Sequence, residues 1–136
     1  MECGATWTPQ ETQPRGQFYH VAGDNAFPDH VYGAQKDTQN LAIASSAADG
    51  VIGREDWFQA GGGECGFVIP DPRDWHIIYS NNEGFITRYD KSNEQYEDVS
   101  VWPLDNSGHA ASDLKHRFHW VSPPLISAPD PNPPTP

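Results

Sequence analysis

Three acidic side chains close to a tryptophan are the residues of this chain that could bind or cleave a sugar. Glu55, Asp56 and Glu64 flank a glycine-rich stretch that also holds Trp57. Glycoside hydrolysis commonly uses two carboxyl groups about 5–10 Å apart, and a sugar subsite needs an aromatic face with a few polar groups. Asp56, Trp57 and Glu64 are therefore candidate ligand-binding residues, although no residue is assigned a catalytic role. In the other interpretation, Trp57 packs between neighbouring sheets and the acids cap turns.

Two arginines complete the set of candidate binding residues. Arg88 and Arg117 could bind an anionic ligand, because a guanidinium group recognises carboxylates and phosphates. They could equally pair with the acidic excess of the chain or stack on aromatic rings.

Metal and cofactor chemistry receives little support from the sequence. Asp113, His116 and His119 are spaced by three residues, and a helix would place them on one face. A helical turn is expected over 112–116, but residues 117–120 are typical of a strand, which breaks that face. The glycines at 61–63 lack the Lys-Ser/Thr pair of a phosphate-binding loop, and indicate a tight entry into the next strand instead. We expect no metal site and no cofactor.

The charge balance excludes several kinds of partner. The chain has 19 acidic and 8 basic residues and a formal net charge of −11. Nucleic acid is an unexpected partner, because phosphate binding depends on clustered Lys and Arg, and an anionic membrane surface is unexpected for the same reason.

No apolar run is long enough for a membrane-spanning helix. Cys3 and Cys65 define neither a disulfide framework nor a zinc pattern.

A repeated unit organises the elements that must position these residues. Asp24 and Asp71 each precede a tyrosine, Tyr32 and Tyr79, by the same spacing. Together with the stretch from Leu125 to Pro136, they define three similar units. Self-similarity over about 40–50 residues is typical of propeller blades.

Short apolar runs between turns predict strands rather than helices. The second repeat is the clearest, because four runs follow one another with short turns between them. The segment 47–63 is predicted to be a long loop. Strands are expected at 17–22, 30–35, 41–46, 65–70, 75–80, 85–90 and 96–102, with a further strand start at 121–127.

Several local sequences resemble one family of proteins. GATW at 4–7 resembles the end of an Asp box, the turn of bacterial-neuraminidase-type repeats. The run from GREDW at 53–57 to PDPN at 129–132 resembles bacterial β-propellers related to sortilin-type receptors and xyloglucanase-type glycoside hydrolases. The chain departs from the family pattern at its ends, with Glu2 in place of the box aspartate and prolines after Asn132.

The resemblance implies an all-β fold of antiparallel four-stranded propeller blades, about two to two and a half blades of a larger β-propeller. The expected division is a partial propeller over 1–128, with blades at roughly 1–64 and 65–120 and the start of a third at 121–128. Residues 129–136 are expected to form a mobile proline-rich tail.

The function that the resemblance implies is recognition. We expect a carbohydrate or protein ligand, with the remaining blades as a further partner, in an extracytoplasmic or secreted parent protein. The alternatives are part of a xyloglucanase-like glycoside hydrolase acting on a polysaccharide, or a sortilin-like scaffold that binds peptides.

Overall fold

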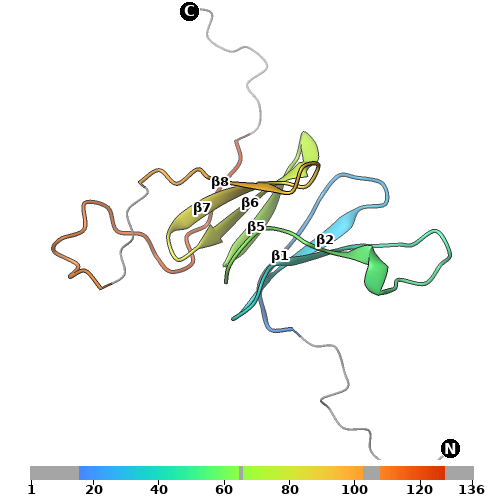
Figure 1. Ribbon diagram of the computed structural model, residues 1–136, viewed down its shortest axis with the longest axis horizontal. Coiled ribbons are helices and arrows are strands. Elements are labelled where there is room, and N and C mark those ends of the chain that lie inside the picture. Colours follow the sequence, from blue (N-terminus) through green and yellow to red (C-terminus); the bar gives the residue numbers. More distant parts are fainter. Residues whose placement is uncertain (1–15, 65, 103–107, 128–136) are drawn as a thin grey trace, which may run out of the picture.

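The computed structural model describes residues 16–64, 66–102 and 108–127, and these form an all-β protein (Figure 1). Eight strands make two four-stranded antiparallel sheets, and in each sheet the strands are neighbours in chain order. We call β1–β4 sheet A and β5–β8 sheet B. The strands are β1 (Phe18–Gly23), β2 (His30–Gln35), β3 (Leu41–Ala44), β4 (Trp57–Gln59), β5 (Phe67–Asp71), β6 (Asp74–Asn82), β7 (Phe85–Asp90) and β8 (Gln95–Asp98).

Most of the predicted strands are confirmed, and four local predictions are wrong. The long loop predicted over 47–63 contains a 3₁₀ turn, η2 (Arg54–Asp56), and then β4, the last strand of sheet A. The helical turn expected over 112–116 is a simple turn, in which the Asp113 amide donates to the Ala110 carbonyl at 2.9 Å. The strands expected at 117–120 and 121–127 are irregular chain.

One face of each sheet supplies a shared core. Side chains alternate across a strand, so every second residue of sheet A points toward sheet B. We call these the inner faces. The core cluster joins both sheets and consists of Tyr32, Ala34, Ala42, Ala60, Val68, Ile78 and Tyr89.

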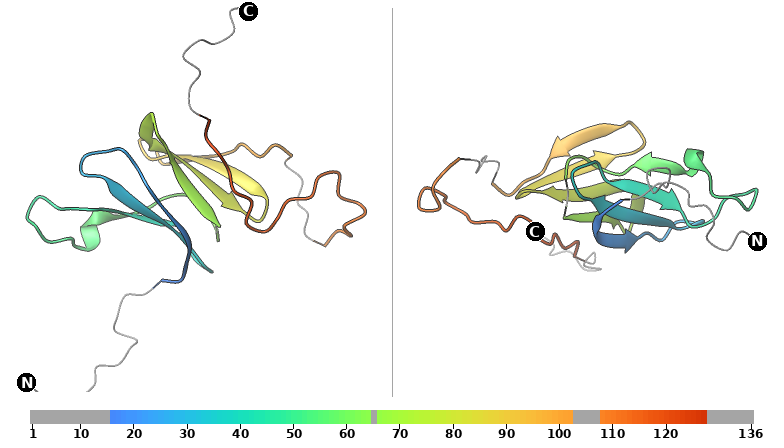
Figure 2. Two further views of the ribbon diagram at one scale, coloured as in Figure 1. Left: turned by 180° about the vertical axis from the view of Figure 1, so that it is seen from behind. Right: turned by 90° about the horizontal axis from the view of Figure 1, so that it is seen from below.

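The two sheets stack as adjacent layers, with β1 and β2 lying against β5 (Figure 2). Two ring stacks cross the interface. The rings of His20 and Phe67 lie 3.9 Å apart, and those of His30 and Trp75 lie 4.8 Å apart. The contact between the sheets is thus aromatic at its rim, and its centre combines aliphatic side chains with Tyr32 and Tyr89.

The opposite face of sheet A carries exposed apolar side chains. We call it the outer face. Val21, Val31 and Trp57 on this face are exposed by 65%, 41% and 43%. Two pairing rows of the sheet define it, which are Val21–Gly33–Leu41–Gln59 and Gly23–Val31–Ile43–Trp57.

The far face of sheet B is partly covered by the end of the described chain. The Ser122 amide donates to the Asn81 side-chain oxygen at 3.2 Å, and the Val121 side chain lies where a Cβ on Gly66 would stand. The two sheets therefore differ, because only the outer face of sheet A is broadly exposed. No helix within the described residues is long and apolar enough to cross a membrane.

Candidate functional site

An apolar groove lies on the outer face of sheet A, beside the chain that leads into β4. Its volume is about 810 Å³. Its walls are mostly aliphatic and aromatic, and Gln35 and Arg54 contribute polar groups. The principal apolar residues of the groove are Phe18, Leu41, Ile43, Ile52 and Trp57.

The local sequence explains how Trp57 reaches this groove. One carboxylate oxygen of Asp56 accepts from the Gly53 amide at 2.6 Å, which closes the short turn η2. The chain then extends, and Trp57 begins β4 opposite Ile43. Asp56 thus stabilises the turn that positions Trp57, as the second interpretation of these acids expects.

The structure places Glu64 away from Asp56. The Tyr19 hydroxyl donates to a Glu64 carboxylate oxygen at 2.7 Å, and this hydrogen bond, with burial second, raises the pKa of Tyr19. Tyr19 lies on β1, whereas Asp56 directly precedes β4, and these strands are the two edges of sheet A. The two acids are therefore held at opposite edges of sheet A.

The two candidate arginines lie outside the groove. Arg88 is on β7, where its guanidinium nitrogens stand 3.9 Å from carboxylate oxygens of both Asp90 and Glu97. Arg117 is exposed in the irregular segment before Phe118. The structure thus leaves the five candidate residues dispersed, with only Trp57 lining the groove.

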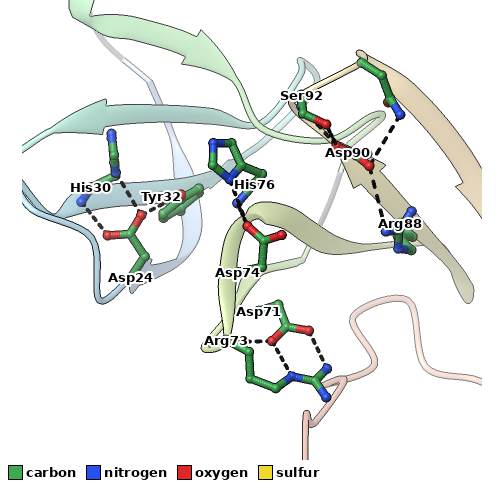
Figure 3. Close-up of polar contacts among 11 residues, drawn as sticks. Asp24, His30, Tyr32, Asp71, Arg73, Asp74, His76, Arg88, Asp90 and Ser92 are labelled. Atoms are coloured by element: carbon green, nitrogen blue, oxygen red, sulfur yellow. Dashed lines mark hydrogen bonds and ion pairs between the residues drawn. The ribbon is translucent and has the colours of Figure 1, made fainter.

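Asp24 is the centre of a polar cluster in which its carboxylate has four contacts (Figure 3). Its side chain is 1% exposed. One oxygen accepts from the amides of Ala26 and His30 at 3.2 and 2.8 Å. The other contacts His30 Nδ1 at 2.8 Å and accepts from the Tyr32 hydroxyl at 2.9 Å.

The electrostatics of this cluster keep Asp24 ionised. Burial alone would raise its pKa, but the hydrogen bonds from His30 and Tyr32 outweigh burial and lower the pKa. The pKa of Tyr32 is raised, first by burial and then by its bond to Asp24. A carboxylate held ionised in this way suits a structural anchor better than a general acid.

Sheet B carries a different arrangement at the equivalent aspartate. Asp71 is the last residue of β5, whereas Asp24 directly follows β1. The Arg73 side chain donates to both oxygens of Asp71, at 2.9 and 2.6 Å. These bonds lower the pKa of Asp71 to about 2. Next to it, His76 Nδ1 lies 2.8 Å from Asp74 (Figure 3). The repeated Asp–Tyr spacing therefore marks a repeated strand position but not a repeated contact.

Lys91 joins the two sheets through aromatic rings. Its ammonium nitrogen lies 3.6 Å from the Phe58 ring centre and 4.2 Å from the Trp75 ring centre. Because burial removes water from the ammonium group, the pKa of Lys91 is lowered. The sequence does not predict this contact, because Lys91 is an isolated basic residue in a predicted turn.

The histidines and the glycine run singled out in the sequence lie in structural contacts rather than in a metal or phosphate site, as far as the described residues show. His116 packs its ring edge against Trp102, with 5.3 Å between ring centres. Among residues 16–64, 66–102 and 108–127, no three His, Cys, Asp or Glu side chains gather around a common point. Gly61 has a φ of +104°, and a Cβ at this position would stand 2.7 Å from Ser80 Oγ, which explains the glycine in the tight connection between the sheets.

The Asp-box remnant at 4–7 and the tail at 129–136 lie outside the described residues. The groove and the Asp24 cluster are thus the two features on which a functional interpretation can rest. Comparison of the chain with protein-family models, curated proteins and solved structures finds no match.

Proposed function

We propose that this chain is a recognition module of β-propeller type, and that it binds a protein ligand through the groove around Trp57. The observation that carries the proposal is the half-exposed Trp57 ring in a groove of about 810 Å³ with mostly apolar walls. Exposed apolar patches rimmed by polar groups are typical of protein-binding surfaces. Aromatic residues are also enriched among the side chains that dominate binding energy.

The arrangement of the sheets supports the propeller part of the proposal. Both sheets are four-stranded meanders with strands in chain order, as in a propeller blade. They stack through a common core, and the segment around Ser122 lies against sheet B as a third layer would begin. The resemblance noted from the sequence adds an extracytoplasmic parent protein with further blades as partners.

Carbohydrate recognition is the second candidate function. The Trp57 ring with Arg54 and Gln35 nearby offers a stacking face and hydrogen-bond donors for a sugar. A hydrolase role is favoured less, because Asp56 closes a turn and Glu64 is bound at the other edge of the sheet.

Selection from a phage-displayed peptide pool tests the proposal. Apolar peptides should be enriched on the wild-type chain, and Trp57→Ala should weaken their binding about tenfold or more, since an aromatic anchor is worth about 2 kcal/mol. Trp120→Ala is the matched control, because Trp120 is 56% exposed but does not line the groove.

A panel of xyloglucan oligosaccharides separates the two candidates. Binding of these sugars that is lost in Trp57→Ala would replace the protein ligand by a carbohydrate. A chain that binds neither peptides nor sugars would contradict both.

A further inference from the structure

We infer that the groove around Trp57 binds a linear segment of a partner protein in which one Asp or Glu side chain stands among large apolar residues, and that Arg54 pairs with this carboxylate. The inference rests on the proposed function, because it names the chemistry of the protein ligand. It depends on the charge of Arg54, on an apolar recess that continues the groove, and on the side-chain amide of Gln35.

Arg54 carries a positive charge that no described residue pairs with. The chain has a formal net charge of −11, so carboxylates are abundant around its few basic side chains. Arg54 is exposed, yet it has neither an ion pair nor a ring contact with any residue that the structure describes. Its guanidinium is therefore available to a ligand. The described basic side chains that do have such a partner are Lys36, Arg73, Arg88, Lys91 and Lys115.

The position of Arg54 favours a carboxylate as the group that it binds. Arg54 lines the groove together with Trp57 and other apolar side chains. A guanidinium presents its N–H donors in a planar fork that matches the two oxygens of a carboxylate. A ligand that covers the apolar walls removes water from such a pair, and a lower dielectric strengthens the attraction between opposite charges. An acidic side chain of the ligand thus complements this part of the groove.

A second, smaller recess continues the groove across the outer face of sheet A. Its volume is about 190 Å³, and Val21 and Val31 form part of its wall. No charged side chain lines it, so it suits a large apolar side chain of the ligand. The acidic residue of the ligand therefore has apolar neighbours. The two recesses share Phe18, Leu41, Ile43 and Trp57.

Gln35 gives the groove a group that can bind a peptide backbone. It is the last residue of β2, whereas Arg54 begins η2, and both line the groove. A side-chain amide has donors and an acceptor, which are the groups that a peptide bond pairs with. One cation, one amide and apolar walls together match a peptide segment that carries one acid among apolar residues.

Two carboxylates close to Arg54 limit how many acidic residues the ligand can carry. A Cβ on Gly53, which lines the groove, would meet the carboxylate of Glu55. The carboxylate of Asp56 accepts from the Gly53 amide at 2.6 Å. Together with the net charge of the chain, these groups repel a strongly acidic segment. We therefore expect a single Asp or Glu in the ligand rather than a run of them.

Selection from a random peptide pool displayed on phage, without a free C-terminus, tests the inference. Peptides enriched on the wild-type chain should combine one Asp or Glu with apolar residues. Arg54→Glu should shift the enrichment to Lys or Arg in place of the acid. Arg117→Glu is the matched control and should select as the wild type does. It changes the net charge by the same amount, and Arg117 is exposed and does not line the groove.

A synthetic peptide with blocked ends measures the pair directly. We take the most enriched sequence and its counterpart with the acid replaced by the amide, and titrate each by fluorescence anisotropy. On the wild-type chain the replacement should raise the dissociation constant about tenfold, because a hydrogen-bonded charge is lost. Arg54→Gln should bind the two peptides equally, whereas Arg117→Gln should keep the difference. Far-UV circular dichroism shows whether each variant is folded, and Arg54→Gln decides the question if Arg54→Glu unfolds.

The outcomes separate this inference from the proposed function. Apolar peptides without an acid, selected equally by Arg54→Glu, would overturn the inference and leave a protein-binding groove. A chain that selects no peptide, or peptides that bind Trp57→Ala as well as the wild type, would contradict the proposed function too.

Two further outcomes would assign the groove to another occupant and overturn the inference. Peptides that bind only after removal of residues 1–15 would assign it to that segment of the chain. Dimers that the selected peptides dissociate, seen by sedimentation velocity, would assign it to a second copy.

Discussion

The Asp24 carboxylate connects the loop that follows β1 to the strand β2. Its two oxygens take four contacts, from two backbone amides, the His30 ring and the Tyr32 hydroxyl. Bonds to a charged acceptor are worth about 1.5–3 kcal/mol each in favourable cases. Because the same contacts lower the pKa of Asp24, its contribution to stability depends on pH.

Replacing Asp24 by Asn should weaken the fold and flatten its response to acid. An acid whose folded pKa is lowered contributes stability above its usual value of 3.8, and this stability is lost as the pH falls through the folded value. We expect a loss of about 1–3 kcal/mol at neutral pH and a smaller further loss between neutral pH and pH ~3. Urea unfolding at several pH values measures both quantities. Asp113→Asn, at an exposed turn, is the control. An unchanged acid response would assign the pH dependence to other groups, Asp71 first among them.

Lys91 should contribute to the contact between the sheets through its charge. Lys91→Met keeps an unbranched apolar side chain and removes the ammonium group. We expect a loss of about 1–2 kcal/mol, the value of a desolvated cation–π contact, in the free energy of unfolding in urea. Lys115→Met is a matched control, because Lys115 stands 4.1 Å from the Trp102 ring but is exposed. Its loss should be smaller, and equal losses would mean that burial of Lys91 adds nothing.

At the scale of elements, the strands were predictable where alternation and turns agreed. The predicted strands at 30–35 and 85–90 match β2 and β7, because aromatic and β-branched residues there are bounded by polar turns. The strand β4 was missed, since three residues after a long glycine-containing stretch carry too little pattern to identify. Its partner β3 supplies the hydrogen bonds that define it.

The candidate site was less predictable than the strands. Asp56 and Trp57 are consecutive residues, so the sequence alone could predict that an acid capping a turn precedes this tryptophan. Glu64 reaches β1 instead, through Tyr19, because the connection between the sheets crosses from β4 back to the other edge. Contacts between distant strands, such as that of Lys91 with Phe58, depend on how the sheets stack, and no local pattern encodes this.

Substitution of Ile78, on β6, tests whether the two sheets share one core. It is completely buried where the two inner faces meet. Ile78→Ala should cost about 2–5 kcal/mol through lost burial and the cavity it leaves, measured by thermal or urea unfolding. Ile52→Ala is the control, because Ile52 is 45% exposed. A loss no larger than that of the control would contradict the central position of Ile78.

At the scale of the whole molecule, one core serves two sheets. The core cluster takes residues from both of them, and Lys91 and two ring stacks cross between them. Neither sheet has an apolar core of its own within the described residues. The sheets should therefore unfold together.

Urea unfolding of the full chain checks this expectation. Tryptophan fluorescence and far-UV circular dichroism should give coincident transitions, which is the test of a two-state process. Two separated transitions would show that the sheets are independent units.

The edges of the two sheets have a consequence for how copies of this chain can aggregate. The outer strand β8 exposes all of its residues and includes Glu97 and Asp98, and the outer strand β4 has only three residues. Charged or very short edge strands resist hydrogen bonding to another chain. Another chain therefore cannot readily extend sheet A beyond β4 or sheet B beyond β8, so that any cross-β growth would have to start from β1 or β5, the other edges of the two sheets.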